Sequence, residues 1–300
     1  MILRRLPRRG KKRGFATSIM PNPWQDSTHA EAAWGRSRNA SARWAIAGAV
    51  LGVLIGLVVF APAQWLAVAV SSATNHRVLL TDARGTVWSG SAVLVLTGGA
   101  DSRDASALPG RIDWTLGLQG SRVSVKARHD CCLNGTVTLL VSPGFGRFSV
   151  ALLPQPGWVG QWPSSLLSGL GTPWNTLQLG GSLRVQSTGL NLEWVQGRLI
   201  FDGQADIELS QASSRLSTLN TLGSYRVSIS GSAANASEPP QLNLVTTEGA
   251  LKLSGSGTVT PKGVRFRGEA SAGPDDLPAL TNLLNIIGRR DGARSVISIG

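Results

Sequence analysis

The pattern of hydrophobic and polar positions divides the chain into three parts. Residues 1–43 are mostly polar, residues 44–70 form an almost continuous apolar run that only Gln64 interrupts, and residues 77–300 alternate in short apolar and polar steps. About 20 apolar residues in a helix are enough to cross the ~30 Å hydrocarbon layer of a membrane. The pattern therefore predicts a transmembrane helix over 44–70, which Pro62 bends near its outer end.

Residues 77–300 carry the period-two alternation that is typical of β-strands. The runs are bounded by Gly, Pro, Asn, Asp or Ser, which are residues that turn a chain, and they recur about every 8–15 residues, as in all-β proteins. We expect an antiparallel β-sheet domain with one apolar face, arranged as a sandwich, a barrel or an open groove. The clearest strands are predicted over 111–118, 122–128, 136–141, 147–153, 181–186, 190–196, 198–201, 205–209, 224–230, 241–246, 250–255, 257–260, 264–270 and 295–299.

Two segments of this region have the spacing of helices instead. In 163–170 the leucines fall on one face, and in 276–287 apolar residues recur at i, i+3, i+6, i+7 and i+10. Asp275 or Asp276 can cap the second helix, and Gly288 can end it. The sequence thus predicts one or two short helices, of which the second covers one end of the sheet.

The charge of the chain sets the expected topology. The net charge is +12, and residues 1–43 hold ten basic and two acidic side chains, or +8, which leaves 12 − 8 = +4 for the rest. Basic residues before a membrane span and few after it place the N-terminus in the cytoplasm. We expect a disordered basic cytoplasmic tail over 1–43, a span over 44–70 with Trp44 and Trp65 at the two interfaces, and a periplasmic β domain over 77–300.

The alternatives to an uncut anchor start from the same residues. A cleaved signal peptide would use the Ala-x-Ala-like site around Pro62, but its basic region of about 43 residues and its apolar core would both be unusually long. A basic tail is also typical of proteins that bind nucleic acid or anionic lipid; the positive-inside rule accounts for it without either partner. Translation starting at Met20 instead of Met1 would keep this topology.

Three glycines recur every four residues along the apolar run. Gly48, Gly52 and Gly56 fall on one face of the expected helix, and small residues in this register let another transmembrane helix approach closely. Glycine is also simply frequent in membrane helices. The stripe indicates a transmembrane partner helix or a homodimer as one interpretation.

The sequence offers no catalytic constellation. It has no Gly-x-Ser-x-Gly elbow, P-loop, His-Glu-x-x-His or Gly-x-Gly-x-x-Gly motif, and its three histidines lie far apart in the sequence. Two cysteines and three histidines are too few for a typical structural zinc site. We expect a protein that is not an enzyme, with no cofactor and no metal.

Cys131 and Cys132 are adjacent, just before an Asn-Gly turn. Adjacent side chains of a strand point to opposite faces, which disfavours a bond between them. In a turn, however, a vicinal disulfide could form, and an oxidising compartment would put free thiols at risk. A vicinal disulfide and two buried thiols both remain open at this stage.

Tryptophan is the remaining candidate for a contact surface, because it buries a large area and keeps a polar handle. Trp88, Trp114 and Trp194 lie in predicted strands, and we expect them in the core. Trp158 and Trp162 lie in a Pro/Gly-rich stretch that is typical of a loop. These two are therefore the candidates for partner contact.

The order of these features resembles a known family. An anchor followed by Gly85-Thr-Val-Trp-Ser-Gly-Ser-Ala92, Trp114-Thr-Leu116 and Leu283-Leu-Asn-Ile-Ile-Gly-Arg-Arg-Asp-Gly292 is similar to type II secretion system protein N, the general secretion pathway N component. The resemblance covers the chain from about residue 44 to residue 300. Its motifs are structural rather than catalytic.

The resemblance implies a single-pass protein of the bacterial inner membrane with a periplasmic domain. It implies a non-catalytic accessory role in the export of folded proteins, with contacts to the secretin or to the inner-membrane platform. The Gly-led strands behind one anchor are also similar to AsmA-like proteins, so the alternative is a periplasmic protein that binds or transfers lipid. A scaffold should close its apolar face over a core, whereas a lipid carrier should leave an apolar trough.

Overall fold

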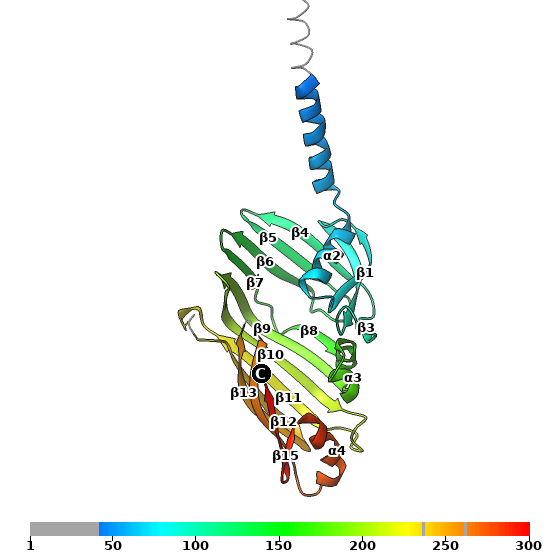
Figure 1. The fold of residues 1–300 in the computed structure, drawn as a ribbon, viewed down its shortest axis with the longest axis vertical. Coiled ribbons are helices and arrows are strands. Elements are labelled where there is room, and N and C mark those ends of the chain that lie inside the picture. The colour runs from blue at the N-terminus through cyan, green and yellow to red at the C-terminus, as the bar shows by residue number, and fades with distance from the viewer. Residues whose placement is uncertain (1–41, 236–237, 261–262) are drawn as a thin grey trace, which may run out of the picture. The chain divides into compact units, whose positions relative to one another are not determined.

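The structure is a computed structural model that describes residues 42–235, 238–260 and 263–300 (Figure 1). Most of the basic tail predicted over 1–43 lies outside the described residues. The chain divides after Val58 into two units, each of which is described by itself.

The apolar run forms two helices rather than the single helix expected over 44–70. Helix Ala42–Val59 is long and apolar enough to cross a membrane, and no part of it is buried within the protein. A second helix, α2 (Ala63–Ala73), begins after Pro62, whose backbone is extended. Proline lacks an N–H group and disfavours the helical conformation in the residue before it, so the helix breaks here rather than bending.

The segment around this break belongs to the β unit. The Ala61 carbonyl accepts a hydrogen bond from the Val87 N–H at 2.8 Å, and Pro62 forms a bridge with Thr86. Ala61 and Ala63 are buried. The outer third of the predicted span, which includes the expected anchor Trp65, is therefore part of the fold of the second unit.

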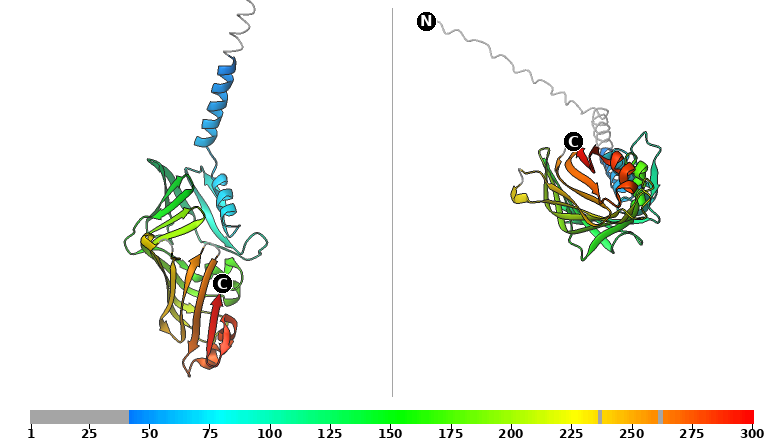
Figure 2. Two further views of the ribbon diagram at one scale, coloured as in Figure 1. Left: turned by 60° about the vertical axis from the view of Figure 1, so that its left-hand side comes forward. Right: turned by 90° about the horizontal axis from the view of Figure 1, so that it is seen from below.

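One 16-stranded antiparallel sheet makes up most of this second unit, which confirms the predicted fold class. Strands follow one another almost in chain order from β1 at one edge to β15 at the other, and within the described residues the sheet does not close into a barrel (Figures 1 and 2). Only β3 and β8 lie off this path, paired with β2 and β9. The strands are β1 (Val78–Gly85), β2 (Ser89–Thr97), β3 (Ala105–Ala107), β4 (Ile112–Gln119), β5 (Arg122–Arg128), β6 (Thr136–Gly144), β7 (Arg147–Leu152), β8 (Trp158–Pro163), β9 (Gly180–Val195), β10 (Arg198–Ser213), β11 (Gly223–Gly231), β12 (Gln241–Gly249), β13 (Leu251–Thr260), β14 (Gly263–Ala272), β15 (Arg289–Asp291) and β16 (Arg294–Ile299).

Some predicted pairs of short strands are single long strands. The segments 181–186 and 190–196 are both part of β9, because the glycine-containing interruption between them is a β-bulge and not a turn. The register shifts there, where Gly189 pairs with Gln204 and Ser187 with Ala205. The bulge keeps the apolar side chains of β9 on one face along its whole length.

The two faces of the sheet differ in chemistry. Successive register partners across six strands form an apolar row, namely Leu118, Val123, Val141, Val150, Leu192 and Phe201. A row of the opposite face consists of Thr115, Lys126 and Thr138. Because side chains alternate along a strand, this pattern gives the sheet one apolar and one polar face.

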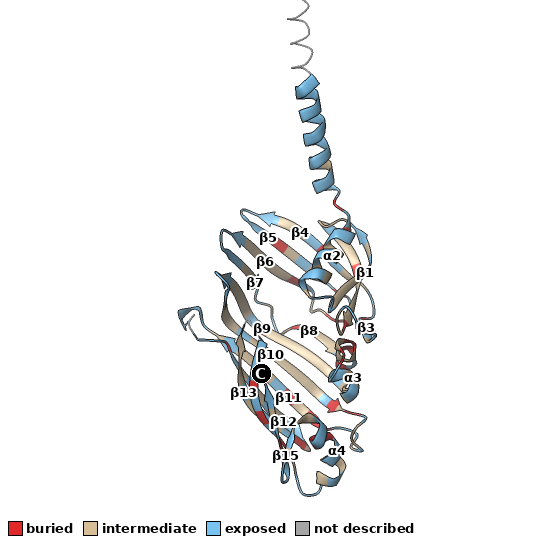
Figure 3. Cartoon of the chain, in the orientation of Figure 1, coloured by how far each residue is buried: buried red, intermediate tan, exposed pale blue. Residues whose placement is uncertain are grey.

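The helices of this unit pack on the apolar face. Helix α2 covers β1 and β2 around Ala92 and Trp114, and the 3₁₀ helix η1 (Ser164–Leu170) packs near Leu108. Helix α4 (Leu277–Ile287) packs three buried leucines against β11, β13 and β14 (Figure 3). The two helices predicted over 163–170 and 276–287 are thus present; the short α3 (Trp174–Leu177) was not predicted.

Helix α4 begins and ends where the sequence predicts. Asp276 is its N-cap residue, although its side chain makes no capping hydrogen bond, and Gly288 is its C-cap residue. A second, very short 3₁₀ helix, η2 (Ala233–Asn235), lies in the connection after β11.

Candidate functional site

Part of the apolar face is not covered by any helix of the described residues. We call this part the open apolar surface. Its side chains are half-buried or exposed, and none belongs to a buried core cluster of the described chain. It consists of Leu118, Val123, Val125, Leu139, Val141, Phe148, Val150, Leu152, Leu190, Leu192, Trp194 and Phe201.

Aromatic side chains mark one end of this surface. Phe148 and Trp194 are partners in the register of β7 and β9, their ring centroids lie 5.9 Å apart, and they are 43% and 38% exposed. Phe145 lies in the adjacent β6–β7 turn and is fully exposed. Contiguous exposed apolar groups of this kind mark interaction sites in soluble domains.

Charged side chains lie on the polar face at the ends of the same strands. Arg147 forms an ion pair with Glu193 at 2.7 Å, and Arg122 and Arg198 are exposed at the neighbouring hairpins. The open apolar surface is therefore bordered by basic side chains where the hairpins turn.

The covered part of the apolar face contains a cavity of about 430 Å³ that is partly open to solvent. It lies between strands β9–β13 and helices η1, α3 and α4. Its sheet side includes Leu183, Ile207, Leu209, Val227, Leu244 and Leu253, and its helix side includes Trp174, Leu177, Leu283 and Ile287.

Among the residues that line the cavity, Tyr225 has a hydroxyl group, which can both donate and accept a hydrogen bond. Its hydroxyl donates a hydrogen bond to the Leu251 carbonyl at 3.0 Å, and burial of the side chain raises its pKa far above the ordinary value. The hydroxyl is thus neutral and already bonded to the backbone. The cavity is therefore lined by apolar groups.

A second hollow of about 570 Å³ continues the first. The two share Trp174, Leu177, Leu253 and Ile287 as lining residues, and the second extends past Gly288 to β15 and β16. Arg289 is the one charged residue among its lining residues. The pair of hollows thus has an apolar interior and a basic residue at one side.

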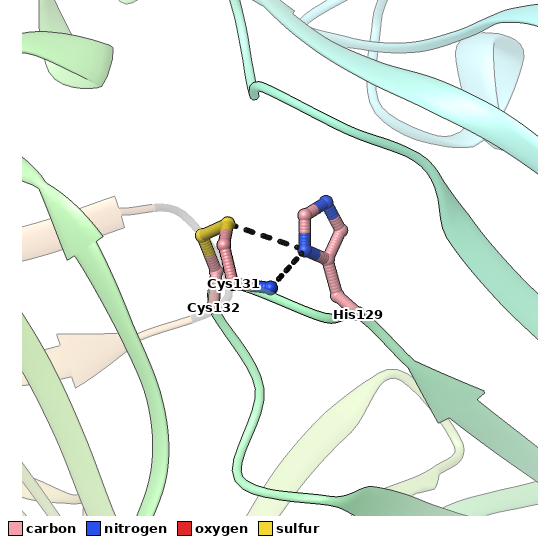
Figure 4. A group of neighbouring side chains, drawn as sticks. All are labelled: His129, Cys131 and Cys132. Atoms are coloured by element: carbon pink, nitrogen blue, oxygen red, sulfur yellow. Dashed lines mark hydrogen bonds between the residues drawn. A yellow bond between two sulfur atoms is a disulfide. The ribbon is translucent and has the colours of Figure 1, made fainter.

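The cysteines form a vicinal disulfide in the turn between β5 and β6 (Figure 4). Cys132 is buried beside Leu108, whereas Cys131 is exposed. His129 is also buried; its Nδ1 accepts a hydrogen bond from the Cys131 N–H at 3.3 Å and lies 3.3 Å from the Cys131 Sγ.

These three residues bring one imidazole nitrogen and two sulfurs within 4.8 Å of one another. Thiolates, and not disulfide sulfurs, are the sulfur ligands of metals. In its oxidised form this turn is therefore a cross-link and not a metal site.

The glycine stripe lies on helix Ala42–Val59. An added Cβ at Gly48, Gly52 or Gly56 would meet nothing within 4 Å. The stripe is open to a neighbouring helix, and whether one binds there stays a prediction.

Some tryptophans lie where the sequence predicts and others do not. Trp158 and Trp162 lie on strand β8 and not in a loop, and Trp162 packs against the cluster of Cys132. Both are half-buried. Trp114 is buried and donates from its indole N–H to the Val87 carbonyl at 3.0 Å, but Trp194, expected in the core, is on the open apolar surface.

The comparisons with known proteins point to one family. The model of type II secretion system (T2SS) protein N matches residues 76–297, which is most of the described β unit. Neither a curated protein nor a solved structure matches the chain.

Proposed function

Because the chain belongs to the type II secretion system protein N family and so has a role in type II secretion, we propose that it is a non-catalytic tether of this machinery. In this proposal helix Ala42–Val59 anchors the protein in the bacterial inner membrane with the N-terminus in the cytoplasm. The β unit is then periplasmic and contacts the secretin or the inner-membrane platform.

The length and composition of helix Ala42–Val59 support the anchor. The excess of basic residues before it supports the orientation, since such residues are retained on the cytoplasmic side. The positive charge of the tail needs no nucleic-acid partner in this account.

The open apolar surface is the observation that carries the proposed contact. A monomeric soluble domain rarely leaves a large contiguous apolar patch to water, and such patches mark protein interfaces or ligand-binding grooves. An open apolar face is also what a lipid carrier would show, so the choice of a protein partner is supported by the family and by the aromatic side chains. Trp194, Phe148 and Phe145 supply the large side chains that dominate binding energy at such interfaces. The bordering arginines suit a partner with acidic groups around an apolar centre.

Photocrosslinking in living cells tests this proposal. A photoreactive phenylalanine analogue is placed at Trp194 on the open apolar surface, at Phe145 in the adjacent turn, at Trp158 on β8, and at Lys126 on the polar face as the matched control. We expect adducts with the secretin or the platform at Trp194 and Phe145 and far fewer at Lys126. Equal adducts on both faces, or none with a secretion protein, would overturn the proposed surface.

The anchor has its own test. Gly52→Leu places a bulky side chain on the glycine stripe, and Val50→Leu places the same side chain on the opposite face of the helix. If a second transmembrane helix packs there, Gly52→Leu lowers cysteine- or proximity-based crosslinking of the helix and Val50→Leu does not. Identical behaviour of the two variants would remove the partner helix from the proposal.

A further inference from the structure

We propose that the cavity beneath helices α3 and α4 binds the acyl chain of an anionic amphiphile, with the headgroup at Arg289. This site is separate from the open apolar surface used in the proposed tether, and it adds a ligand to the β unit. The argument depends on the lining of the cavity, on its size and on the charge at its edge.

The size of the cavity is that of a ligand site. Packed interiors hold few voids larger than a water molecule. Small-molecule sites span about 300–1,000 Å³, and the cavity of about 430 Å³ lies within this range by itself.

The lining selects hydrocarbon over water. A bound water needs about two to four polar partners. The side chains of this cavity are aliphatic or aromatic, and the Tyr225 hydroxyl already donates to the Leu251 carbonyl. Water would therefore find no adequate set of partners there.

The lining also disfavours a peptide. Every peptide unit carries an N–H and a carbonyl that cost free energy when they are buried without partners. A peptide that filled both hollows would have to bring part of its backbone in. An acyl chain fills an elongated apolar space with no polar group at all.

The edge of the second hollow supplies the charge. Arg289 lines it, and among the described residues no ion pair joins Arg289 to a carboxylate. The next residue, Arg290, has a buried Nη1 with no hydrogen-bond partner in the described chain. Arg290 follows Arg289 in strand β15, so its side chain points to the other face, and it does not line the hollow. The Arg289 guanidinium at the end of an apolar cavity suits a carboxylate or phosphate headgroup.

Labelling of the full chain in cells tests the site. Cells are fed a photoactivatable, alkyne-tagged palmitic acid, irradiated, and the adducts are mapped by mass spectrometry. We expect adducts on the lining peptides of β10, β11 and β12. The adduct mass distinguishes the free fatty acid from a phospholipid that has incorporated it, and adducts on residues 42–59 serve as the internal reference for general membrane labelling.

Two variants of neighbouring residues separate the cavity from the rest of the sheet. Leu244→Trp fills the cavity, whereas Asn243→Trp adds the same ring on the exposed polar face of β12. Leu244→Trp should lower the cavity adducts at least several-fold relative to the reference, and Asn243→Trp should not. Where Leu244→Trp does not accumulate, Ile207→Phe makes a smaller addition to the same cavity.

The headgroup has a separate readout. Arg289→Gln should reduce the cavity adducts of an anionic amphiphile by about twofold to fivefold, which is the range for an exposed charge pair, and Arg289→Lys should restore them. Adducts confined to residues 42–59, or equal adducts in Leu244→Trp and Asn243→Trp, would overturn the site. Crosslinks from the cavity to a protein in place of lipid would show that a peptide occupies it, which would also overturn the proposal.

Discussion

The cover that α4 gives to the apolar face can be tested at Leu284. This side chain is fully buried in the cluster that includes Tyr225, Leu251 and Ala270. Its carbonyl accepts a hydrogen bond from the Ser295 hydroxyl at 2.7 Å, and Leu284→Ala leaves this backbone contact in place. The substitution therefore removes packing alone.

The expected loss follows from the atoms removed. Leu→Ala deletes three carbon groups, and at about 0.8 kcal/mol each their burial contributes about 2.4 kcal/mol. The cavity left behind raises the loss to about 3–5 kcal/mol, a large part of the 5–15 kcal/mol that is typical of a whole protein. For a unit of this size each 1 kcal/mol lowers the Tm by about 2–4 °C, so the expected fall is about 6–20 °C.

Thermal unfolding of the full chain, followed by the far-UV signal of the sheet, measures this loss. Ile286→Ala on the same helix is the matched control, because Ile286 is 47% exposed and its truncation should cost about 0.5 kcal/mol or less. A similar shift for both variants, or none for Leu284→Ala, would refute the account of α4 as a packed cover.

Three further predictions concern single residues of the β unit. Tyr225→Phe removes a buried hydrogen bond worth about 1 kcal/mol. Because burial raises the pKa of this sole tyrosine, the free energy of unfolding of the parent should decline as the pH rises above about 10. Urea titrations at different pH values should show a weaker decline in the variant. Gly249→Ala should destabilise the unit by roughly 2 kcal/mol or more in the same urea titration, because Gly249 has a φ of +119° and its added Cβ would collide with the Gly223 backbone; an unchanged midpoint would contradict this. In urea without reductant, maleimide should add to one thiol of Cys131→Ser, namely Cys132, and to none in the parent chain; two added groups in the parent would contradict the disulfide.

The sequence predicts those elements whose pattern is local. Helix α4 was predictable because its apolar spacing, Asp276 and Gly288 all lie within one short segment. The hairpin strands β4 to β7 were predictable because alternation and turn residues agree along them. The length of β9 was not predictable, because a glycine such as Gly189 is equally typical of a turn and of a β-bulge. Only the pairing of β9 with β10 shows that it lies in a bulge.

The candidate sites depend on contacts that are distant in sequence. Alternation places Trp194 on the apolar face, but only the position of the helices decides that this part of the face is open. In the same way, β8 pairs with β9 across the segment that holds η1 and α3, so the Pro- and Gly-rich composition around Trp158 and Trp162 wrongly predicted a loop. The cavity could not be predicted from the sequence, because its lining residues come from three helices and five strands.

The connections between strands explain why the apolar face has a covered part and an open part. At one end of the sheet the connections between β4 and β5, β6 and β7, and β9 and β10 are two residues each, as in tight hairpins, and too short for a helix. At the other end the longer connections contain η1, α3 and α4, and α2 precedes β1 there (Figure 1). Helices inserted at one end can cover the face only near that end. The face is consequently covered over the cavity on the helical side and open toward the hairpins, where Phe148 and Trp194 are exposed. The proposed acyl site and the proposed partner surface can therefore be altered by separate substitutions.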